Sequence, residues 1–261
     1  MSTVTAPSPR APVLFVAHGA PMLLDDAGWV DELHRWGAAL AKPTAILMIS
    51  AHWEARPLTI AATRPVPLIY DFYGFPERFY RLKYAAPGAP ALADRVRGLL
   101  RAADVEVADA PTRGLDHGSY IPLMCMYPEA DVPVLQISMP SLEPAALFAV
   151  GRALAPLRDE GVPIVGSGFL THNLGAMRSP VTPQWATEFD AWIADVLLRR
   201  DVDALLDYRA RAPALRLAHP TQEHFAPVLV SAGAALDADT VRFPIEGFWF
   251  GSFTRRSLQL G

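Results

Sequence analysis

Six of the seven histidines in this chain lie in loop-forming sequence beside β-rich or helical stretches. His18 directly follows the apolar run PVLFVA, His52 follows AILMIS after one alanine, and His172 follows VPIVGS in the phrase GSGFLTHN. A single loop histidine is usually a surface or hydrogen-bonding residue, but three at equivalent places after β-rich runs can share one site. Neutral imidazole suits Zn, Fe, Cu and Ni, so the pattern indicates a transition-metal pocket, with iron or zinc as the metal.

The other histidines differ in how well they could contribute. His117 lies in the Gly-bracketed phrase RGLDHGS, predicted as a turn, and His219 and His224 share HPTQEH before a helical stretch, so all three could reach the same pocket. His34, in DELHRWG, is predicted to be a solvated residue of an amphipathic helix. Zinc in such a pocket would imply hydrolysis by an activated water, and ferrous iron with open positions would imply oxygen chemistry. The ligand types alone do not choose between the two.

The elements that must position these residues alternate along the chain. Short β-rich runs, each typical of a strand buried on both faces, occur at Pro12–Ala17, Ala45–Ser50, Val132–Ser138, Val162–Ser167 and Val241–Pro244. Helix-period stretches lie between them, at Trp29–Ala41, Pro90–Ala103, Glu143–Glu160, Gln184–Arg199, Val202–Arg209 and Thr221–Ala235. This alternation predicts an α/β fold with a central, mostly parallel sheet flanked by helices. The active-site crevice is expected at the carboxyl ends of the strands.

The length and composition indicate one compact domain. The 261 residues are 51% hydrophobic and 19% charged, which suits a single domain over residues 1–261, with 1–11 expected to be flexible. The segment Pro65–Gly88 interrupts the alternation and is predicted to be a long ordered loop. Its aromatic run YDFYGFPERFY could line a pocket for a ring-shaped substrate or pack the loop onto the domain.

The charge and cysteine content favour a small-molecule partner in a reducing compartment. A net charge of -4 without runs of like charge gives no footprint for nucleic acid or an anionic membrane. The lone cysteine, Cys125, forms no disulfide within the chain, and the polar start MSTVTAPSPR lacks the apolar stretch of a signal peptide, so we expect a cytoplasmic protein. Cys125 lies among apolar residues and is interpreted as a core thiol. The Gly166–Gly168 phrase lacks the rest of a nucleotide-binding fingerprint and is interpreted as close backbone packing.

The ordered phrases LFVAHGAPML, ISAHWE, YDFYGFPERFY, LDHGSYIPL, GSGFLTHNL and HPTQEHFAPVLV resemble the class III extradiol ring-cleavage dioxygenases (catalytic-subunit-B type), and within them the DOPA 4,5-dioxygenase branch. The resemblance spans roughly Pro12 to Phe253, nearly the whole chain. It implies oxygen-dependent cleavage of a catechol to a muconic-semialdehyde-type product by a non-haem metal. The implied partners are therefore a catechol and O₂.

The same resemblance assigns roles to the histidines. His18 and His52 correspond to the two histidine ligands that follow the first two strands of the family. The third ligand is His224, with the adjacent Glu223 as the rival. His172 corresponds to the active-site acid/base after GSG and is a further possible metal ligand. Fe(II) is the metal implied for activity, and Zn(II) can occupy the site in isolated protein because zinc outranks Fe(II) in affinity at nitrogen sites.

His117 corresponds to the family histidine that hydrogen-bonds bound oxygen or a substrate hydroxyl without binding the metal. Two alternatives remain beside the dioxygenase. One is a zinc hydrolase with Glu223 as the general base, and the other is a non-catalytic binding protein of the same fold.

Overall fold

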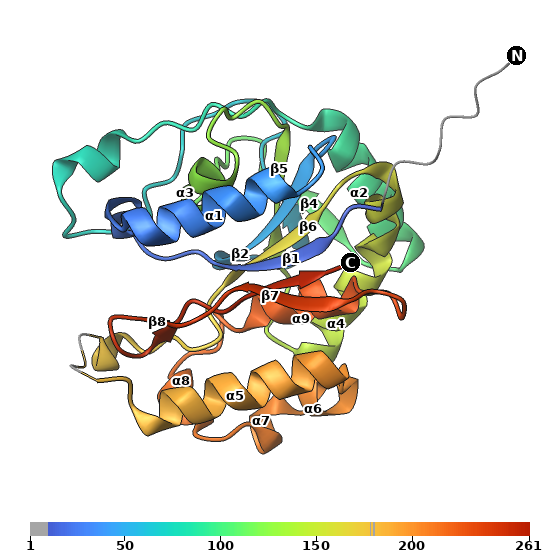
Figure 1. Ribbon diagram of the computed structural model, residues 1–261. Coiled ribbons are helices and arrows are strands. Elements are labelled where there is room, and N and C mark those ends of the chain that lie inside the picture. Colours follow the sequence, from blue (N-terminus) through green and yellow to red (C-terminus); the bar gives the residue numbers. More distant parts are fainter. Residues whose placement is uncertain (1–9, 178, 180) are drawn as a thin grey trace, which may run out of the picture.

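The computed structural model describes residues 10–177, 179 and 181–261, and its core is a twisted sheet with helices on both faces (Figure 1). Eight strands of the described residues form this sheet in the order β4-β3-β5-β2-β6-β1-β10-β7. Their bounds are β1 Val13–Ala17, β2 Ile46–Glu54, β3 Leu58–Ile60, β4 Val107–Asp109, β5 Val134–Met139, β6 Ile164–Gly168, β7 Val241–Ile245 and β10 Ser257–Leu260. A separate small ribbon pairs β8 (Phe248–Trp249) with β9 (Phe253–Thr254).

The four strands at the middle of the sheet, β5, β2, β6 and β1, run parallel to one another. Antiparallel pairing begins on both sides of these four strands, because β10 is antiparallel to β1 and to β7 beyond it, and β3 is antiparallel to β5. Every residue of β1, β5 and β6 is buried, as the continuous apolar runs predict for strands covered on both faces. The predicted α/β fold with a mostly parallel sheet is therefore confirmed.

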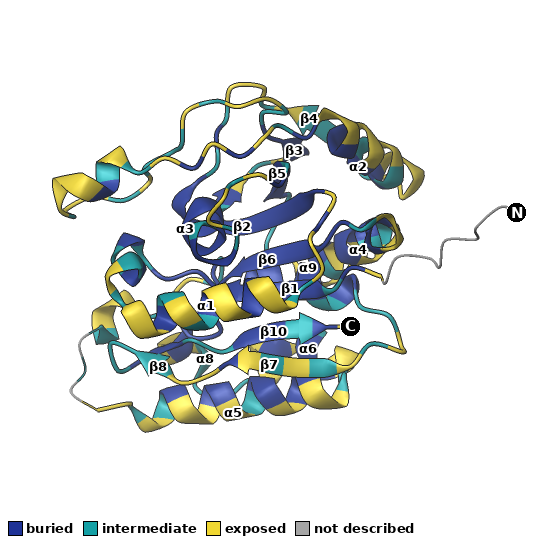
Figure 2. Cartoon of the chain, turned by 45° about the horizontal axis from the view of Figure 1, so that its top comes forward, coloured by how far each residue is buried: buried dark blue, intermediate teal, exposed yellow. Residues whose placement is uncertain are grey.

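Helices cover the two faces of the sheet as separate layers, with their exposed sides outward (Figure 2). One apolar cluster joins Leu14 and Val16 of β1 to the helices α1 and α3, and the other joins Val13 and Phe15 to α2, α4, α5 and α9. This division follows from the alternation of side chains along a strand. The helices are α1 Ala27–Ala39, α2 Pro90–Ala102, α3 His117–Met126, α4 Pro144–Leu154, α5 Gln184–Arg199, α6 Val202–Leu206, α7 Tyr208–Arg211, α8 Leu215–Ala218 and α9 Ala226–Gly233.

All five predicted strands are present, but several helical segments differ from their predictions. The stretch predicted at Thr221–Ala235 is helical only from Ala226 to Gly233, because the HPTQEH phrase forms turns. The stretch predicted at Glu143–Glu160 changes to a 3₁₀ helix after Leu154, and Val202–Arg209 divides into α6 and α7. Residues 1–9 of the segment expected to be flexible lie outside the described residues, while Ala11 is buried and its N–H donates to the carbonyl of Arg158 at 2.9 Å.

The predicted turn around His117 is wrong, because this residue begins α3. The side chain of Asp116 caps the helix by accepting from the N–H of Ser119 at 3.2 Å. Gly118 and Pro122 give this segment a low helix propensity, but almost all its residues are buried, so tertiary packing decides its conformation.

The long Pro65–Gly88 segment is an ordered loop, as predicted, with one short 3₁₀ helix at Glu77–Arg81. Phe79 is buried, and the hydroxyl of Tyr70 donates to the carbonyl of Leu82 at 2.6 Å. Oδ1 of Asp71 in this loop also accepts from the backbone N–H of His117 at 3.0 Å, which ties the loop to the start of α3. No helix among the described residues is long and apolar enough to cross a bilayer.

Candidate metal centre

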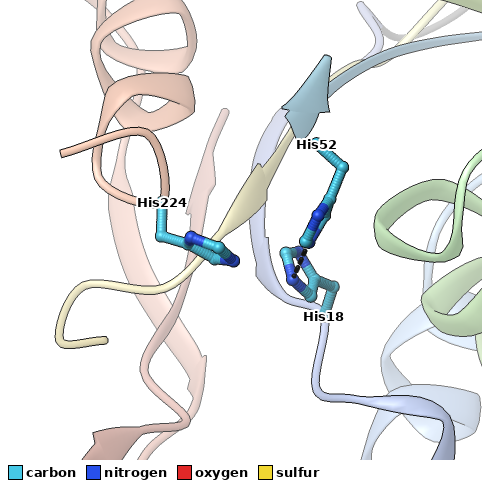
Figure 3. Close-up of side chains that lie close together, drawn as sticks. All are labelled: His18, His52 and His224. Carbon is cyan, nitrogen blue, oxygen red and sulfur yellow. Dashed lines mark hydrogen bonds between the residues drawn. The ribbon is translucent and has the colours of Figure 1, made fainter. Parts of the chain in front are cut away.

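Three histidines from distant parts of the sequence converge at the carboxyl ends of the parallel strands (Figure 3). His18 directly follows β1, His52 lies near the end of β2, and His224 lies two residues before α9. One ring nitrogen of each lies within 4.8 Å of the others, and the Nε2 atoms of His18 and His52 are 3.1 Å apart. The three rings therefore form a compact cluster of nitrogen donors that could hold one metal ion.

The Nδ1 atoms of His18 and His52 face hydrogen-bond acceptors on the outside of this cluster. Ser167 Oγ lies 3.0 Å from Nδ1 of His18, and its hydroxyl donates to the carbonyl of Gly118, so it can accept from the ring. The carboxylate of Asp71 lies 3.4 Å from Nδ1 of His52. Acceptors at both positions favour the tautomers with hydrogen on Nδ1, which leave the Nε2 lone pairs directed inward.

His224 has the same arrangement. Its Nδ1 lies 2.9 Å from Oε1 of Glu223, and the hydroxyl of Thr221 donates to the same oxygen at 3.0 Å. Glu223 thus acts as a hydrogen-bond acceptor for His224, and its Oε1 is already engaged twice. This geometry favours His224 over Glu223 as the donor toward the other two histidines.

The environment keeps these imidazoles neutral. Burial lowers the pKa of His18 and His52 well below the usual value, and the neighbouring histidines lower it further. Burial also lowers the pKa of His224 to about 3, with contributions from His219 and His117. Neutral imidazole is the form that binds a metal.

The donor set fits a transition-metal ion. With hydrogen on both Nδ1 atoms, the Nε2 lone pairs of His18 and His52 face each other at 3.1 Å in a buried site, which is repulsive unless a cation lies beside them. Without a cation, one of the two rings must carry its hydrogen on Nε2 instead, and its Nδ1 then no longer donates to the acceptor that it faces. A bound cation would satisfy both lone pairs together with that of His224.

His172 and His117 lie at the edge of this cluster. The ring of His172 stacks on that of His224, with centroids 3.5 Å apart and planes 6° from parallel. Burial and the neighbouring His224 lower the pKa of His172 to about 2. His117 lies against His52, with centroids 4.0 Å apart, and its Nδ1 is 2.8 Å from Oδ1 of Asp71.

A cavity of about 480 Å³ opens directly onto the five rings, which confirms the predicted crevice. Phe72 and Phe75 of the long loop contribute aromatic walls to this cavity, while Tyr70 and Leu82 of the same loop pack against the apolar cluster that includes α1 and α3. Further aromatic walls come from Phe169, Trp249 and Phe253. The volume and lining suit a small, flat aromatic molecule.

Glycine is required at two places where backbone approaches the cluster. A Cβ on Gly118 would lie 2.3 Å from Ser50 Oγ and 2.9 Å from Cδ2 of His52. A Cβ on Gly168 would lie 2.1 Å from the carbonyl oxygen of His224, so this glycine allows the segment before α9 to pack against β6. Close packing thus explains the Gly166–Gly168 phrase.

The remaining predicted residues lie away from the cavity. His219 is 2% exposed, packs against Phe189 and Phe225, and has Nε2 2.9 Å from the carbonyl oxygen of Leu170, so the expectation that it could reach the pocket is wrong. His34 is exposed on α1, and Cys125 is a buried thiol, both as predicted.

Sequence reasoning missed Asp71, which contacts both His52 and His117. The one available signal was a carboxylate in the middle of the aromatic phrase YDFYGF.

Comparison with known proteins places this chain in a family. Residues 13–252 match the family described as the catalytic LigB subunit of aromatic ring-opening dioxygenase. The chain belongs to the LigB family. LigB-family proteins are extradiol ring-cleavage dioxygenases that depend on a non-haem metal, which agrees with the histidine cluster.

Individual relatives cover almost the whole chain. A Beta vulgaris protein named 4,5-DOPA dioxygenase extradiol is 44% identical over 229 residues, with 85% of each chain covered. An Escherichia coli K12 protein of the same name is 39% identical, with 97% of this chain and 96% of the relative covered. The crystal structure of an uncharacterised Escherichia coli K12 protein superposes with a TM-score of 0.80 at 35% identity, covering 97% of this chain and 100% of the other. The LigB assignment therefore holds for sequence and fold together.

Proposed function

We propose that this chain cleaves a catechol with O₂ beside its two hydroxyls, using one Fe(II) ion held by His18, His52 and His224. The observation that carries the proposal is the inward convergence of three neutral imidazoles whose outer nitrogens all have acceptors. Three protein ligands leave positions for a chelating catechol and for O₂. When bound, the metal supplies Lewis acidity toward the catechol hydroxyls and the redox partner for O₂.

His172 is the proposed acid/base. Its ring lines the cavity beside His224, and its low pKa means that it meets the substrate as a neutral imidazole able to accept a proton. Protonation becomes favourable when a negative catecholate oxygen lies next to the ring, because the two opposite charges then stabilise each other. The same proton can be returned later in the reaction.

His117 is proposed to accept a hydrogen bond from a catechol hydroxyl. Asp71 accepts from its Nδ1, so Nε2 remains for the cavity that His117 lines. Aromatic walls from Phe72 and Phe169 exclude water and hold a flat ring. These features support a catechol substrate, and two relatives carry the name 4,5-DOPA dioxygenase extradiol.

The zinc hydrolase alternative is less well supported. Its general base would be Glu223, but Oε1 of this carboxylate already accepts from Thr221 and lies 2.9 Å from Nδ1 of His224. We also propose that isolated protein carries zinc, since zinc binds nitrogen sites more tightly than Fe(II). The single buried Cys125 supports a cytoplasmic location.

The test is to load metal-free protein anaerobically with Fe(II), add a panel of catechols, admit oxygen, and follow O₂ uptake and visible absorbance. Extradiol cleavage consumes about one O₂ per catechol and forms a yellow semialdehyde. His18→Ala should abolish both signals, while the matched control His34→Ala, at an exposed position on α1, should leave them intact. No uptake with any catechol by fully iron-loaded protein would overturn the proposal.

A further inference from the structure

The carboxylate of Asp71 lies between two rings of the histidine cluster. Its Oδ1 accepts from the backbone N–H of His117 at 3.0 Å and lies 2.8 Å from Nδ1 of the same residue. Its Oδ2 lies 3.4 Å from Nδ1 of His52. The Asp71 side chain is 23% exposed, and Asp71 lies in the aromatic loop, Pro65–Gly88, and not in a strand of the sheet.

An ionised carboxylate imposes a direction on both contacts. An aspartate side chain is ordinarily ionised at neutral pH, and Oδ1 of Asp71 already accepts from the backbone N–H of His117 at 3.0 Å. The carboxylate can therefore only accept, so each facing Nδ1 must carry hydrogen. The Nε2 atoms of both rings are then left without hydrogen and face away from Asp71.

We propose that Asp71 is a shared positioning residue that fixes the tautomer and ring orientation of His52 and His117 together. Its importance for metal binding rests on the proposed function, in which His52 is a ligand. The arrangement links the metal centre to the aromatic loop, because the residue that orients the rings is followed directly by Phe72, which lines the cavity. The orientation of the two rings therefore depends on the position of this loop.

The substitution Asp71→Asn separates the two contacts. An asparagine whose Oδ1 keeps both bonds to His117 places its NH₂ group against the Nδ1–H of His52, so two donors oppose each other. The flipped amide is worse, because it opposes two donors of His117. Asp71→Asn should therefore disturb His52 and spare His117, whereas Asp71→Ala should release both rings.

The experiment uses the full chain labelled with ¹⁵N at histidine. Long-range ¹H–¹⁵N spectra report the tautomer of each histidine ring. The tautomer of His117 is read in metal-free protein and that of His52 in zinc-loaded protein, and the variants His52→Gln and His117→Gln assign the signals. We expect the Nδ1–H form at both positions in the parent protein. Asp71→Asn should change the signals of His52 alone and weaken zinc binding by about 10–100-fold in a chelator competition. The matched control Glu77→Gln, at an exposed carboxylate of the same loop, should change neither.

The outcomes separate this inference from the proposed function. An unchanged tautomer of His117 in Asp71→Ala, together with unchanged zinc affinity in Asp71→Asn, overturns the positioning role, even if the variants unfold at lower temperature, because a structural role alone would affect stability only. If the tautomers change as expected but His52→Ala retains full zinc affinity, the ligand assignment is overturned while the positioning of the two rings stands.

Discussion

Adding one methyl group at Gly118 should disable the metal centre without contacting the metal. The new Cβ would lie 2.3 Å from Ser50 Oγ, 2.9 Å from Cδ2 of His52 and 3.3 Å from Nδ1 of His18. Normal van der Waals contact lies at 3.4 Å or beyond, so Ser50 must move by about 1 Å. That movement breaks the bond in which the N–H of His52 donates to Ser50 Oγ at 3.2 Å.

Two opposing effects set the magnitude for Gly118→Ala. Alanine in place of glycine inside a helix stabilises by about 1 kcal/mol, while an extra methyl group in a packed site costs about 1–3 kcal/mol. The net loss should lower the melting temperature by roughly 2–4 °C per kcal/mol. Displacement of His52 should also weaken zinc binding by about 10–100-fold.

Gly98 of α2 provides the matched control, because a Cβ there meets nothing within 4 Å. Gly98→Ala should raise the melting temperature and leave zinc affinity unchanged. Calorimetry of the metal-free proteins and chelator competition with zinc would measure both quantities. If Gly118→Ala binds zinc as tightly as the parent protein, the close approach of α3 to the rings does not govern the geometry of the site.

Three further predictions concern single histidines and their partners. His172→Ala should keep its metal but lose about 10²–10⁴-fold in kcat, and loss of the metal would make His172 a ligand. His224→Ala should lower the metal content per chain in elemental analysis, whereas Glu223→Gln should still bind metal, but more weakly. If Glu223→Gln loses more metal than His224→Ala, Glu223 is the ligand. Burial lowers the pKa of His219 from 6.5 to about 4. Between these two pH values His219 is protonated in the unfolded chain but not in the folded protein, so the free energy of unfolding falls as the pH falls from about 6.5 to about 4. In urea titrations the free energy of unfolding of His219→Gln should fall less steeply with pH than that of the parent protein, by up to about 1.4 kcal/mol per pH unit. An unchanged dependence on pH would contradict this.

The sequence was most informative where strand ends decide the position of a residue. His18 and His172 follow buried strands and His52 lies near the end of one, and the carboxyl ends of parallel strands meet at one edge of the sheet whatever the strand order. His224 could not be separated from Glu223 in this way, since neighbouring residues in a turn point in directions that no periodicity specifies. The structure separates them by showing that Glu223 accepts at the outer nitrogen of His224.

Other features were not predictable because long-range packing creates them. Asp71 acts from an irregular loop, where its contacts with His52 and His117 depend on how the loop folds back over the sheet. The strands β3 and β4 have three residues each, too few for a periodic signal, and they form only because neighbouring strands are available.

The proline inside α3 connects helix structure to the chemistry of His18. Pro122 has no N–H, so the carbonyl of Gly118, four residues earlier, lacks its usual helical donor. The hydroxyl of Ser167 donates to this carbonyl instead, and a hydroxyl that donates there presents a lone pair to its other neighbour, Nδ1 of His18. A missing backbone donor in one helix thereby selects the tautomer of a proposed metal ligand, His18, which directly follows β1. Pro122, which lowers the helix propensity of this segment, thus contributes to the hydrogen bonds that orient the His18 ring.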